Sequence, residues 1–465
     1  MKSTLWLGFL IASMSLSQAT ANPPPIDPPG LESVPPCLDP ESMPDAARVP
    51  CRAILIFSEG TAGTERNSVA QAAGAVSIFS YGLIPVLSVY VPDEEVLETL
   101  LSNPEILEVI PDRLVRAIPE ILRRPGGGGG STAAQTVSAG VTRIGAAPGL
   151  LPYTGVGVGV AIVDTGLDFA HADLPVSPNC FTAYTSCQDD QGHGTHVGGI
   201  VAAKNNSQDA VGVAPGAILY SVKVLNAQGS GYDSDIMAGL DWIGQNANTL
   251  SPMIRVANLS LGRSGDLNDN PPMRELFRIL SQNLGITVTV AAGNDRNLEV
   301  SDQVPATYPE VLSIASSTAR DGANGGCRFF TGTIGGDTAS YFTSDGAFDS
   351  ATGIGVTVSA PGNTQEDVAK NCFIKSKGIL SLKLGGGTTE MSGTSMAAPH
   401  AAGVSALLQE QWGGLIDSET VRGLLRGSSS RAGVAPLDSP ASGYSFDGER
   451  EGILSACGAL GITCP

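Results

Sequence analysis

The feature that most constrains the fold is an alternation, after residue 134, of short apolar runs with longer segments of helical periodicity. We expect strands at 158–163, 218–224, 255–260, 286–291 and 355–359, and helices at 194–204, 233–246 and 394–411. Strands that are apolar throughout must be covered on both faces, which is typical of parallel sheets flanked by helices. The sequence therefore predicts a three-layer α/β fold with a mostly parallel central sheet, whose functional residues gather at the carboxyl ends of the strands.

A smaller unit precedes this region. Its pattern predicts strands at 53–57, 76–80, 86–91 and 106–110, and helices at 68–73 and 94–101. We therefore expect a small α+β domain at 52–118, preceded by an extended, proline-rich segment at 22–51. The segment 119–133 contains five consecutive glycines at 126–130, which predict a flexible linker. The larger domain is then expected to cover 134–465.

The N-terminus has the layout of a secretory signal peptide. Lys2 precedes an apolar run at 5–16, and the small residues Ala19 and Ala21 stand where a signal peptidase would cut. The run is well short of the ~20 apolar residues that a membrane-spanning helix needs. We therefore expect a signal peptide at 1–21, secretion to an extracellular or periplasmic space, and no stable membrane insertion.

Acidic side chains outnumber basic ones, 45 to 26, which gives a formal net charge of −19. Such a surface repels the phosphates of nucleic acids and favours cations. We therefore expect no nucleic-acid partner, and we expect the protein to be a monomer.

The eight cysteines form an even set, which fits an oxidising compartment. The eight cysteines can pair in many ways, but disulfides between cysteines that are neighbours in the sequence are favoured because each bond would then close one local loop. The expected disulfides are Cys37–Cys51, Cys180–Cys187, Cys327–Cys372 and Cys457–Cys464. A zinc site is the alternative, and the ligand spacings typical of zinc do not occur.

Three residues at the ends of predicted elements could act together. Asp164 follows a buried apolar run, where the cost of desolvating a carboxylate requires a partner. His193 opens one predicted helix, and Ser395 opens another, whose free N–H groups favour a developing anion. A serine hydroxyl needs a base to accept its proton, and the base needs a carboxylate to fix its tautomer. The three residues are therefore candidates for a catalytic triad.

A fourth candidate, Asn294, follows the predicted strand at 286–291. Its side-chain N–H could stabilise the anionic oxygen of a tetrahedral intermediate, together with the backbone N–H of Ser395. These two donors would form an oxyanion hole.

Each of these segments also has a plainer interpretation. The motif Asp-Thr-Gly at 164–166 also occurs in aspartic proteases, but these need two carboxylates that share a proton, and the sequence contains no second motif of this kind. His193 and His196 could bind a metal from one helical face, yet an H-E-x-x-H motif and a third ligand are absent from the sequence. Taken singly, each residue would more often be structural, and their joint occurrence is what favours catalysis.

Four sequence words, in this order, resemble the subtilisin family: Val-Asp-Thr-Gly at 163–166, His-Gly-Thr-His-Val at 193–197, Ala-Ala-Gly-Asn at 291–294 and Gly-Thr-Ser-Met-Ala-Ala-Pro-His at 393–400. The resemblance extends over about residues 134–411. It implies a subtilisin-like fold and a serine endopeptidase that needs no catalytic cofactor. In that enzyme Asp164 would orient His193 as the general base, Ser395 would be the nucleophile, and Asn294 would serve the oxyanion hole.

The same resemblance implies how the substrate binds. Two segments resemble the edges that hold an extended peptide by main-chain bonds. They consist of Gly229, Ser230 and Gly231, and of Ser260, Leu261 and Gly262. The expected substrate is therefore a polypeptide bound in extended form, whereas His196 is expected to be structural.

The resemblance also implies a structural calcium site. Its ligands would be the side chains of Gln135, Asp173 and Asn206 and the carbonyl oxygens of Lys204, Gln208 and Ala210. A set made only of oxygen ligands suits Ca²⁺. Without the resemblance, the polar segment 205–207 would be interpreted as an ordinary turn.

The small domain at 52–118 resembles the subtilisin propeptide, which assists folding and then inhibits by placing its C-terminal strand in the cleft. A self-processing zymogen is therefore expected, cut in or just after the glycines at 126–130, although this linker departs from the family pattern. A cysteine-clipped insert at 327–372 is a second departure. Asp295 and Asp302 could favour basic substrate side chains or could simply be solvated loop carboxylates.

Two other functions also fit this sequence. A secreted binding protein could keep the fold without activity, although all four active-site positions are filled. Alternatively, an inhibitor or chaperone function could reside in 52–118, with the larger domain as its carrier.

Overall fold

A computed structural model describes the chain over residues 52–118, 134–430 and 451–463, all within the compact unit Cys37–Pro465. Several expected features lie outside the described residues: the signal peptide at 1–21, the proline-rich segment at 22–51, the linker at 119–133, and Cys37, Cys51 and Cys464.

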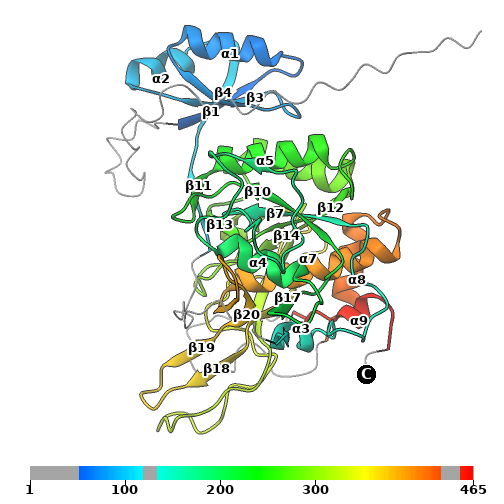
Figure 1. Ribbon diagram of the computed structural model, residues 1–465. Helices are drawn as coiled ribbons and strands as arrows, with labels where there is room; N and C mark the ends of the chain where they lie inside the picture. The colour runs from blue at the N-terminus through cyan, green and yellow to red at the C-terminus, as the bar shows by residue number, and fades with distance from the viewer. Residues whose placement is uncertain (1–51, 119–133, 431–450, 464–465) are drawn as a thin grey trace, which may run out of the picture. The chain divides into compact units, whose positions relative to one another are not determined.

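The domain at 52–118 is a four-stranded antiparallel sheet with two helices (Figure 1). In the order β2-β3-β1-β4, the strands are β2 (Val76–Ser80), β3 (Val86–Tyr90), β1 (Arg52–Phe57) and β4 (Ile106–Pro111), and the helices are α1 (Gly63–Ala72) and α2 (Glu94–Leu101). Alternate residues of β1 serve two cores. Ala53 and Leu55 pack with the two helices, whereas Ile54 joins the apolar cluster of the larger domain.

Helix α1 begins five residues before the expected position at 68. The reason is Arg66, a buried cation at an inward-facing position, which hides the apolar period of the helix. Its guanidinium donates to the backbone carbonyls of Tyr81, Ile84 and Val86 at 2.7 to 2.8 Å. A polar side chain can thus occupy a core position when backbone acceptors satisfy it.

A seven-stranded sheet forms the centre of the larger domain, and all its pairings are parallel. In sheet order the strands are β17 (Val356–Asn363), β16 (Leu312–Thr318), β14 (Thr287–Ala291), β12 (Ile254–Leu259), β7 (Gly159–Asp164), β10 (Ile218–Lys223) and β8 (Phe181–Thr182). The five predicted strands are confirmed. The chain order reverses at β7, and in open parallel sheets such a point forms a crevice at the carboxyl ends of the strands.

The pattern of apolar residues did not predict β16. Its sequence, LSIASST, contains four hydroxyl residues, yet every position in the strand is buried. Ser316, for example, donates its N–H to Thr343 Oγ1 and shares a 2.6 Å hydrogen bond with Ser340 Oγ. Partners from distant segments thus satisfy the hydroxyls of Ser316 and Thr318, whereas Ser313 Oγ and Ser317 Oγ have no partner among the described residues.

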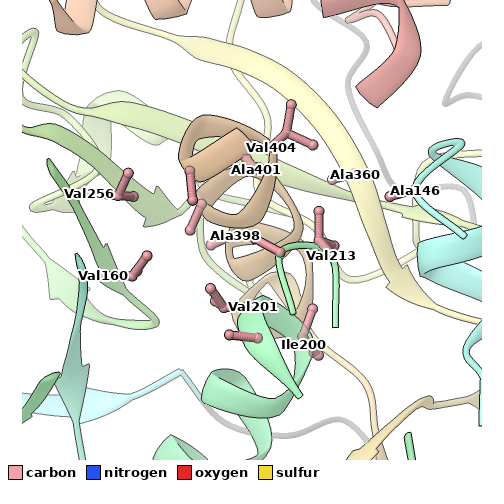
Figure 2. Packing of buried hydrophobic residues seen from close by; sticks show 14 of the residues in the cluster. Ala146, Val160, Ile200, Val201, Val213, Val256, Ala360, Ala398, Ala401 and Val404 are labelled. Carbon is pink, nitrogen blue, oxygen red and sulfur yellow. The ribbon is translucent and has the colours of Figure 1, made fainter. Parts of the chain in front are cut away.

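Helices cover both faces of the sheet, as a three-layer fold requires (Figure 1). They are α4 (His193–Ala202) and α7 (Thr394–Gln411) on one face, and α5 (Asp233–Asn246) and α6 (Pro271–Arg278) on the other. Val160 and Ile162 of β7 pack in the cluster that contains α4 and α7, while Ala161 and Val163 pack in the cluster that contains α5 and α6. Figure 2 shows part of the first cluster, in which Val160 lies near the small residues of α7.

The other elements were not predicted individually, and most of them are short. The strands are β5 (Leu114–Ala117), β6 (Thr136–Val137), β9 (Ala210–Val211), β11 (Ser230–Tyr232), β13 (Leu261–Ser264), β15 (Gln303–Val304), β18 (Gln365–Val368), β19 (Ile374–Lys377), β20 (Ile379–Leu382) and β21 (Thr388–Met391). The helices are α3 (Ala139–Arg143), α8 (Ser418–Ser428) and α9 (Ala456–Ala459), with a π-helical turn at Ile279–Asn283 and a 3₁₀ turn at Val300–Asp302. Within the described ranges, no helix combines the length and the apolar character needed to cross a bilayer.

Two of the expected disulfides are present, Cys180–Cys187 and Cys327–Cys372. Cys457 is also disulfide-bonded, and its expected partner lies outside the described residues. The Cys327–Cys372 bond closes the predicted insert, which ends in the antiparallel hairpin β18–β19 (Figure 1).

Glu366 is a buried carboxylate at the base of this hairpin. Its Oε1 accepts hydrogen bonds from the Tyr341 N–H at 2.9 Å and from Asn363 Nδ2 at 3.1 Å. Burial outweighs these two bonds and raises the pKa of Glu366 to about 7. The folded state therefore holds this proton at pH values where the unfolded chain has already lost it.

We predict that Glu366→Gln raises the melting temperature by several degrees at pH 8 and has little effect at pH 4. Below the unfolded pKa of ~4.3 the wild-type side chain is neutral in both states, and the favourable contribution is lost as pH rises through the folded pKa. A buried glutamine stays neutral throughout. Thermal melts followed by circular dichroism test this, with Glu275→Gln, at a half-exposed glutamate paired with Arg278, as the control. An equal shift at both pH values would contradict it.

Candidate active site

Asp164 and His193 form a buried hydrogen-bonded pair where β7 ends and α4 begins. The distances from His193 Nδ1 to Asp164 Oδ1 and Oδ2 are 2.8 and 3.0 Å, and the two side chains are 1% and 0% exposed. Because a carboxylate only accepts hydrogen bonds, Nδ1 is the donor and Nε2 is the proton-accepting atom of the neutral ring. The Thr165 N–H donates to Asp164 Oδ1 at 2.7 Å and fixes the carboxylate further.

Ser395 lies in the first turn of α7, where backbone N–H groups have no acceptor within the helix. This helix packs against β7, β12 and α4, so the strand ends and the two helix starts belong to one framework. The buried Ser395 Oγ donates to the carbonyl of Ser260 at 3.2 Å and approaches the carbonyl of Ile118 at 3.5 Å. The Ser395 hydroxyl, at the N-terminus of α7, therefore faces the carbonyl of Ile118, which belongs to the same chain.

Asn294 lies beside the start of α7. Its Oδ1 accepts from both the N–H and the Oγ1 of Thr394, each at 2.9 Å. These bonds assign the orientation of the amide, because Nδ2 must then occupy the opposite position. A Cβ placed on Gly393 would come within 2.9 Å of that Nδ2, so the glycine permits the close approach. The amide donor of Asn294 is therefore held next to the segment that carries Ser395.

The two predicted peptide-binding edges are occupied by β5. Val115 pairs antiparallel with Gly231 of β11, and Ala117 pairs antiparallel with Leu261 of β13. Strand β5 thus lies between the two edges and completes the four-stranded sheet β11-β5-β13-β15.

The bonds around Ile118 continue this arrangement to the serine. The Ala117 N–H donates to the Gly229 carbonyl at 2.8 Å, and the Ile118 N–H donates to the Ser260 carbonyl at 3.3 Å. Val115 and Ile118 are buried, whereas Arg116 between them is exposed. The segment is thus held with Val115 and Ile118 in apolar clusters of the protein and with Arg116 toward solvent.

The predicted calcium ligands lie close to one another. Asn206 Nδ2 donates to Asp173 Oδ1 at 2.7 Å, and Gln135 Nε2 donates to the Lys204 carbonyl at 3.0 Å. Backbone pairing of Ala134 with Gln208 and of Thr136 with Ala210 brings the remaining ligands alongside.

Asp209 is an acidic residue of this loop that the sequence analysis did not include. It has a positive φ of 48° and is 8% exposed. Among the described residues, neither its Oδ1 nor Asp173 Oδ2 has a hydrogen-bonding partner, although both atoms are buried. Burial, together with the negative charge of Asp209, raises the pKa of Asp173 to about 6. Because residues 204–209 are all polar, polarity gave no signal by which Asp209 could have been selected.

The other sequence candidates have local partners. His196 is fully buried, and its Nε2 donates to the carbonyls of Ile379 and Thr389 at 3.1 and 3.2 Å. Burial lowers the pKa of His196 to about 3, so the ring is neutral. Asp295 and Asp302 are exposed and accept hydrogen bonds from nearby backbone N–H groups of their own loop.

Comparisons with known proteins show which family this chain resembles. The sequence model of the Subtilase family matches residues 155–458. The chain is 33% identical over 340 residues to M-protease of Shouchella clausii (strain KSM-K16), which covers 72% of this chain and 71% of that protein. It is 34% identical over 284 residues to Subtilisin Savinase of Lederbergia lenta, covering 60% and 86% of the two chains, and 32% identical over 326 residues to Subtilisin E of Bacillus subtilis (strain 168), covering 68% of each. The chain therefore belongs to the subtilase family and is a serine endopeptidase.

Proposed function

We propose that this protein is a secreted, self-processing serine endopeptidase that hydrolyses extended polypeptides through Asp164, His193 and Ser395. The observation that carries the proposal is the 3.5 Å approach of the Ile118 carbonyl oxygen to Ser395 Oγ. Ile118 directly follows β5, and this strand pairs with both peptide-binding edges as a bound substrate would.

In the proposed mechanism, Ser395 Oγ attacks the substrate carbonyl carbon while His193 Nε2 accepts the hydroxyl proton. Asp164 holds the ring in the required tautomer and stabilises the imidazolium. Asn294 Nδ2 and the Ser395 N–H donate to the developing oxyanion. When the tetrahedral intermediate collapses, the C–N bond breaks and His193 returns the proton to the leaving amine. Water then attacks the acyl-enzyme by the same route and releases the acid and the free Ser395.

We propose that 52–118 is a propeptide that inhibits the peptidase domain at 134–465. Beyond the strand β5, charged contacts join the two. Arg52 binds Asp112 of its own domain and Asp235 of α5, each at 2.8 Å. Asp112 in turn accepts the Ser234 N–H at 2.9 Å, which caps the first turn of α5. These contacts support a specific partnership between the propeptide and the enzyme.

The residue after Ile118 bears on where maturation occurs. Pro119 follows in the sequence, so the bond presented to Ser395 is a tertiary amide without an N–H. The ring carbon on that nitrogen hinders the proton delivery that expels the leaving amine. Proline also favours extended backbone at the preceding residue, which suits strand pairing by Ile118. We therefore propose that Ile118–Pro119 resists cleavage and that the maturation cut falls in or just after the glycines at 126–130.

We propose one structural calcium ion in the loop that contains Asn206. The two carboxylate oxygens of Asp173 and Asp209 that lack partners among the described residues fit an oxygen-ligated cation. The side chains of Gln135 and Asn206 and the carbonyls of Lys204, Gln208 and Ala210 would complete the set. The ion would neutralise the two buried acidic groups and stabilise the folded loop, and it would take no part in the reaction.

Three further proposals concern the setting in which the enzyme acts. Its acidic charge disfavours nucleic-acid partners. The N-terminal signal peptide would direct it to an extracellular or periplasmic space, without stable membrane insertion. A monomer contains every residue of the proposed site.

We predict that Ser395→Ala abolishes both peptide hydrolysis and maturation, because no other hydroxyl is proposed as the nucleophile. Intact mass with N-terminal sequencing of the secreted protein reports maturation, and a fluorogenic peptide that copies residues 114–118 reports hydrolysis. Ser405→Ala is the matched control, since Ser405 is buried in the same helix and, among the residues that the structure describes, bonds only to the Ala401 carbonyl. A processed and active Ser395→Ala protein would refute the mechanism. Maturation without hydrolysis of any peptide would favour a binding protein.

We predict that Pro119→Ala creates a cleavage product that ends at Ile118, because the bond presented to Ser395 becomes an ordinary secondary amide. The wild-type chain should release no such product. Mass spectrometry of the fragments formed during maturation tests this, with Glu120→Ala as the control in the same segment. A wild-type fragment that ends at Ile118 would contradict the proposal.

We predict that removing calcium with a chelator lowers the melting temperature of the mature enzyme. A ligand at about 100 times its dissociation constant stabilises the folded state by about 2.7 kcal/mol. Asp209→Asn should reduce this difference, since it removes one negative charge from the proposed ligand set. The measurement is a melting curve with excess Ca²⁺ or excess chelator. Identical wild-type curves in the two conditions would count against the site.

A further inference from the structure

Asp189 is a carboxylate at the centre of the candidate active site that the proposed mechanism does not use. It is 3% exposed and belongs to the loop that follows the Cys180–Cys187 bond. The backbone of this loop is fixed against the end of β7, because the Asp189 N–H donates to the Leu167 carbonyl at 3.0 Å. A buried negative charge in this position needs several donors.

Five donors converge on this carboxylate. Oδ1 accepts from Thr165 Oγ1 at 2.9 Å and from the backbone N–H groups of Gln191 and Gly192 at 3.0 and 2.9 Å. Oδ2 accepts from the N–H and the hydroxyl of Thr195 at 2.9 and 2.6 Å. Helix α4 has no side-chain cap from Gly192, and Asp189 accepts the Gly192 and Thr195 N–H groups from outside the helix, while Gln191 Oε1 accepts the His193 N–H.

These donors belong to residues close in sequence to Asp164 or to His193. Thr165 follows Asp164 directly, Gly192 precedes His193 at the start of α4, and Thr195 lies two residues after His193 in the same helix. A single carboxylate therefore ties the end of the strand that carries the acid to the start of the helix that carries the base.

Thr165 completes the connection. Its hydroxyl gives its one proton to Asp189, which leaves an oxygen lone pair to accept the Gly194 N–H at 2.9 Å. The Thr165 N–H binds Asp164 Oδ1 in the same turn. The packing here is tight, because a Cβ on Gly194 would lie 3.2 Å from Asp164 Cβ. The strand end and the helix start meet with little space between them.

We propose that Asp189 is the positioning residue that sets the distance and orientation between Asp164 and His193. The inference rests on the proposed function and adds to it a residue that acts through Thr165 and the first turn of α4. A carboxylate is required because both oxygens accept. An asparagine would direct an NH₂ group at donors on one side and loosen either the strand end or the helix start.

The test compares Asp189→Asn with Asp190→Asn. Asp190 is the adjacent carboxylate, half-exposed and paired with Lys223, so the control makes the same chemical change beside the site. Each full-length variant is matured by wild-type enzyme immobilised on beads and is then assayed with a fluorogenic peptide that copies residues 114–118. We expect Asp189→Asn to lower kcat by about 10- to 100-fold, as a small misalignment of catalytic groups does, while KM changes by less than about threefold. Asp190→Asn should stay within about twofold of wild type.

A second pair of variants keeps the charge of Asp189 and breaks the connection at Thr165. Thr165→Val removes the bridging hydroxyl and should lower kcat by about tenfold or more, whereas Thr165→Ser retains the hydroxyl and should remain within about threefold of wild type. If Asp189→Asn fails to fold, this pair decides the question.

The proposal is overturned if folded Asp189→Asn keeps the wild-type kcat, or if the two Thr165 variants have equal kcat values. Ser395→Ala, matured on the same beads, separates this proposal from the proposed function. Hydrolysis by Ser395→Ala would refute the proposed function itself, whatever the Asp189 variant does.

Discussion

The structure depends on the way in which one buried charge is satisfied. Asp164 ends a strand whose residues are all buried, and its carboxylate must therefore find donors within the protein. The donors are the Thr165 N–H and His193 Nδ1, and they hold the start of α4 against the end of β7. The hydrogen bond that satisfies the buried Asp164 carboxylate therefore also fixes the tautomer and the orientation of the His193 ring.

Close packing around this pair is possible because the helices carry small residues. Gly194 and Gly199 of α4 approach neighbouring segments so closely that a Cβ on either would lie within 2.5 Å of another atom. Alanines do the same for α7, where Ala398 and Ala401 pack in the cluster that contains Val160 (Figure 2). Two helix N-termini and a strand end can therefore meet at one edge of the sheet, where a crevice is expected from the reversal of strand order.

The chain also supplies the strand that lies between β11 and β13. An extended segment in this position must satisfy its own backbone groups and those of β11 and β13, and β5 does both by pairing with each. This explains why 52–118 contributes five strands rather than the four that were predicted from its own pattern. The fifth strand has no partner inside the small domain, so its existence depends on the larger one.

By itself, the sequence determined the α/β class, the order of the main elements and the four residues of the candidate centre. Continuous apolar runs and the helical periodicity of apolar residues are local properties of the sequence. The motifs around Asp164, His193, Asn294 and Ser395 are local as well. Only the tertiary structure decided the burial of the polar strand β16, the position of Ile118 at Ser395, and the convergence of five donors on Asp189. Each of these depends on hydrogen bonds between segments far apart in the chain, and such bonds leave no periodic pattern in the residues that form them.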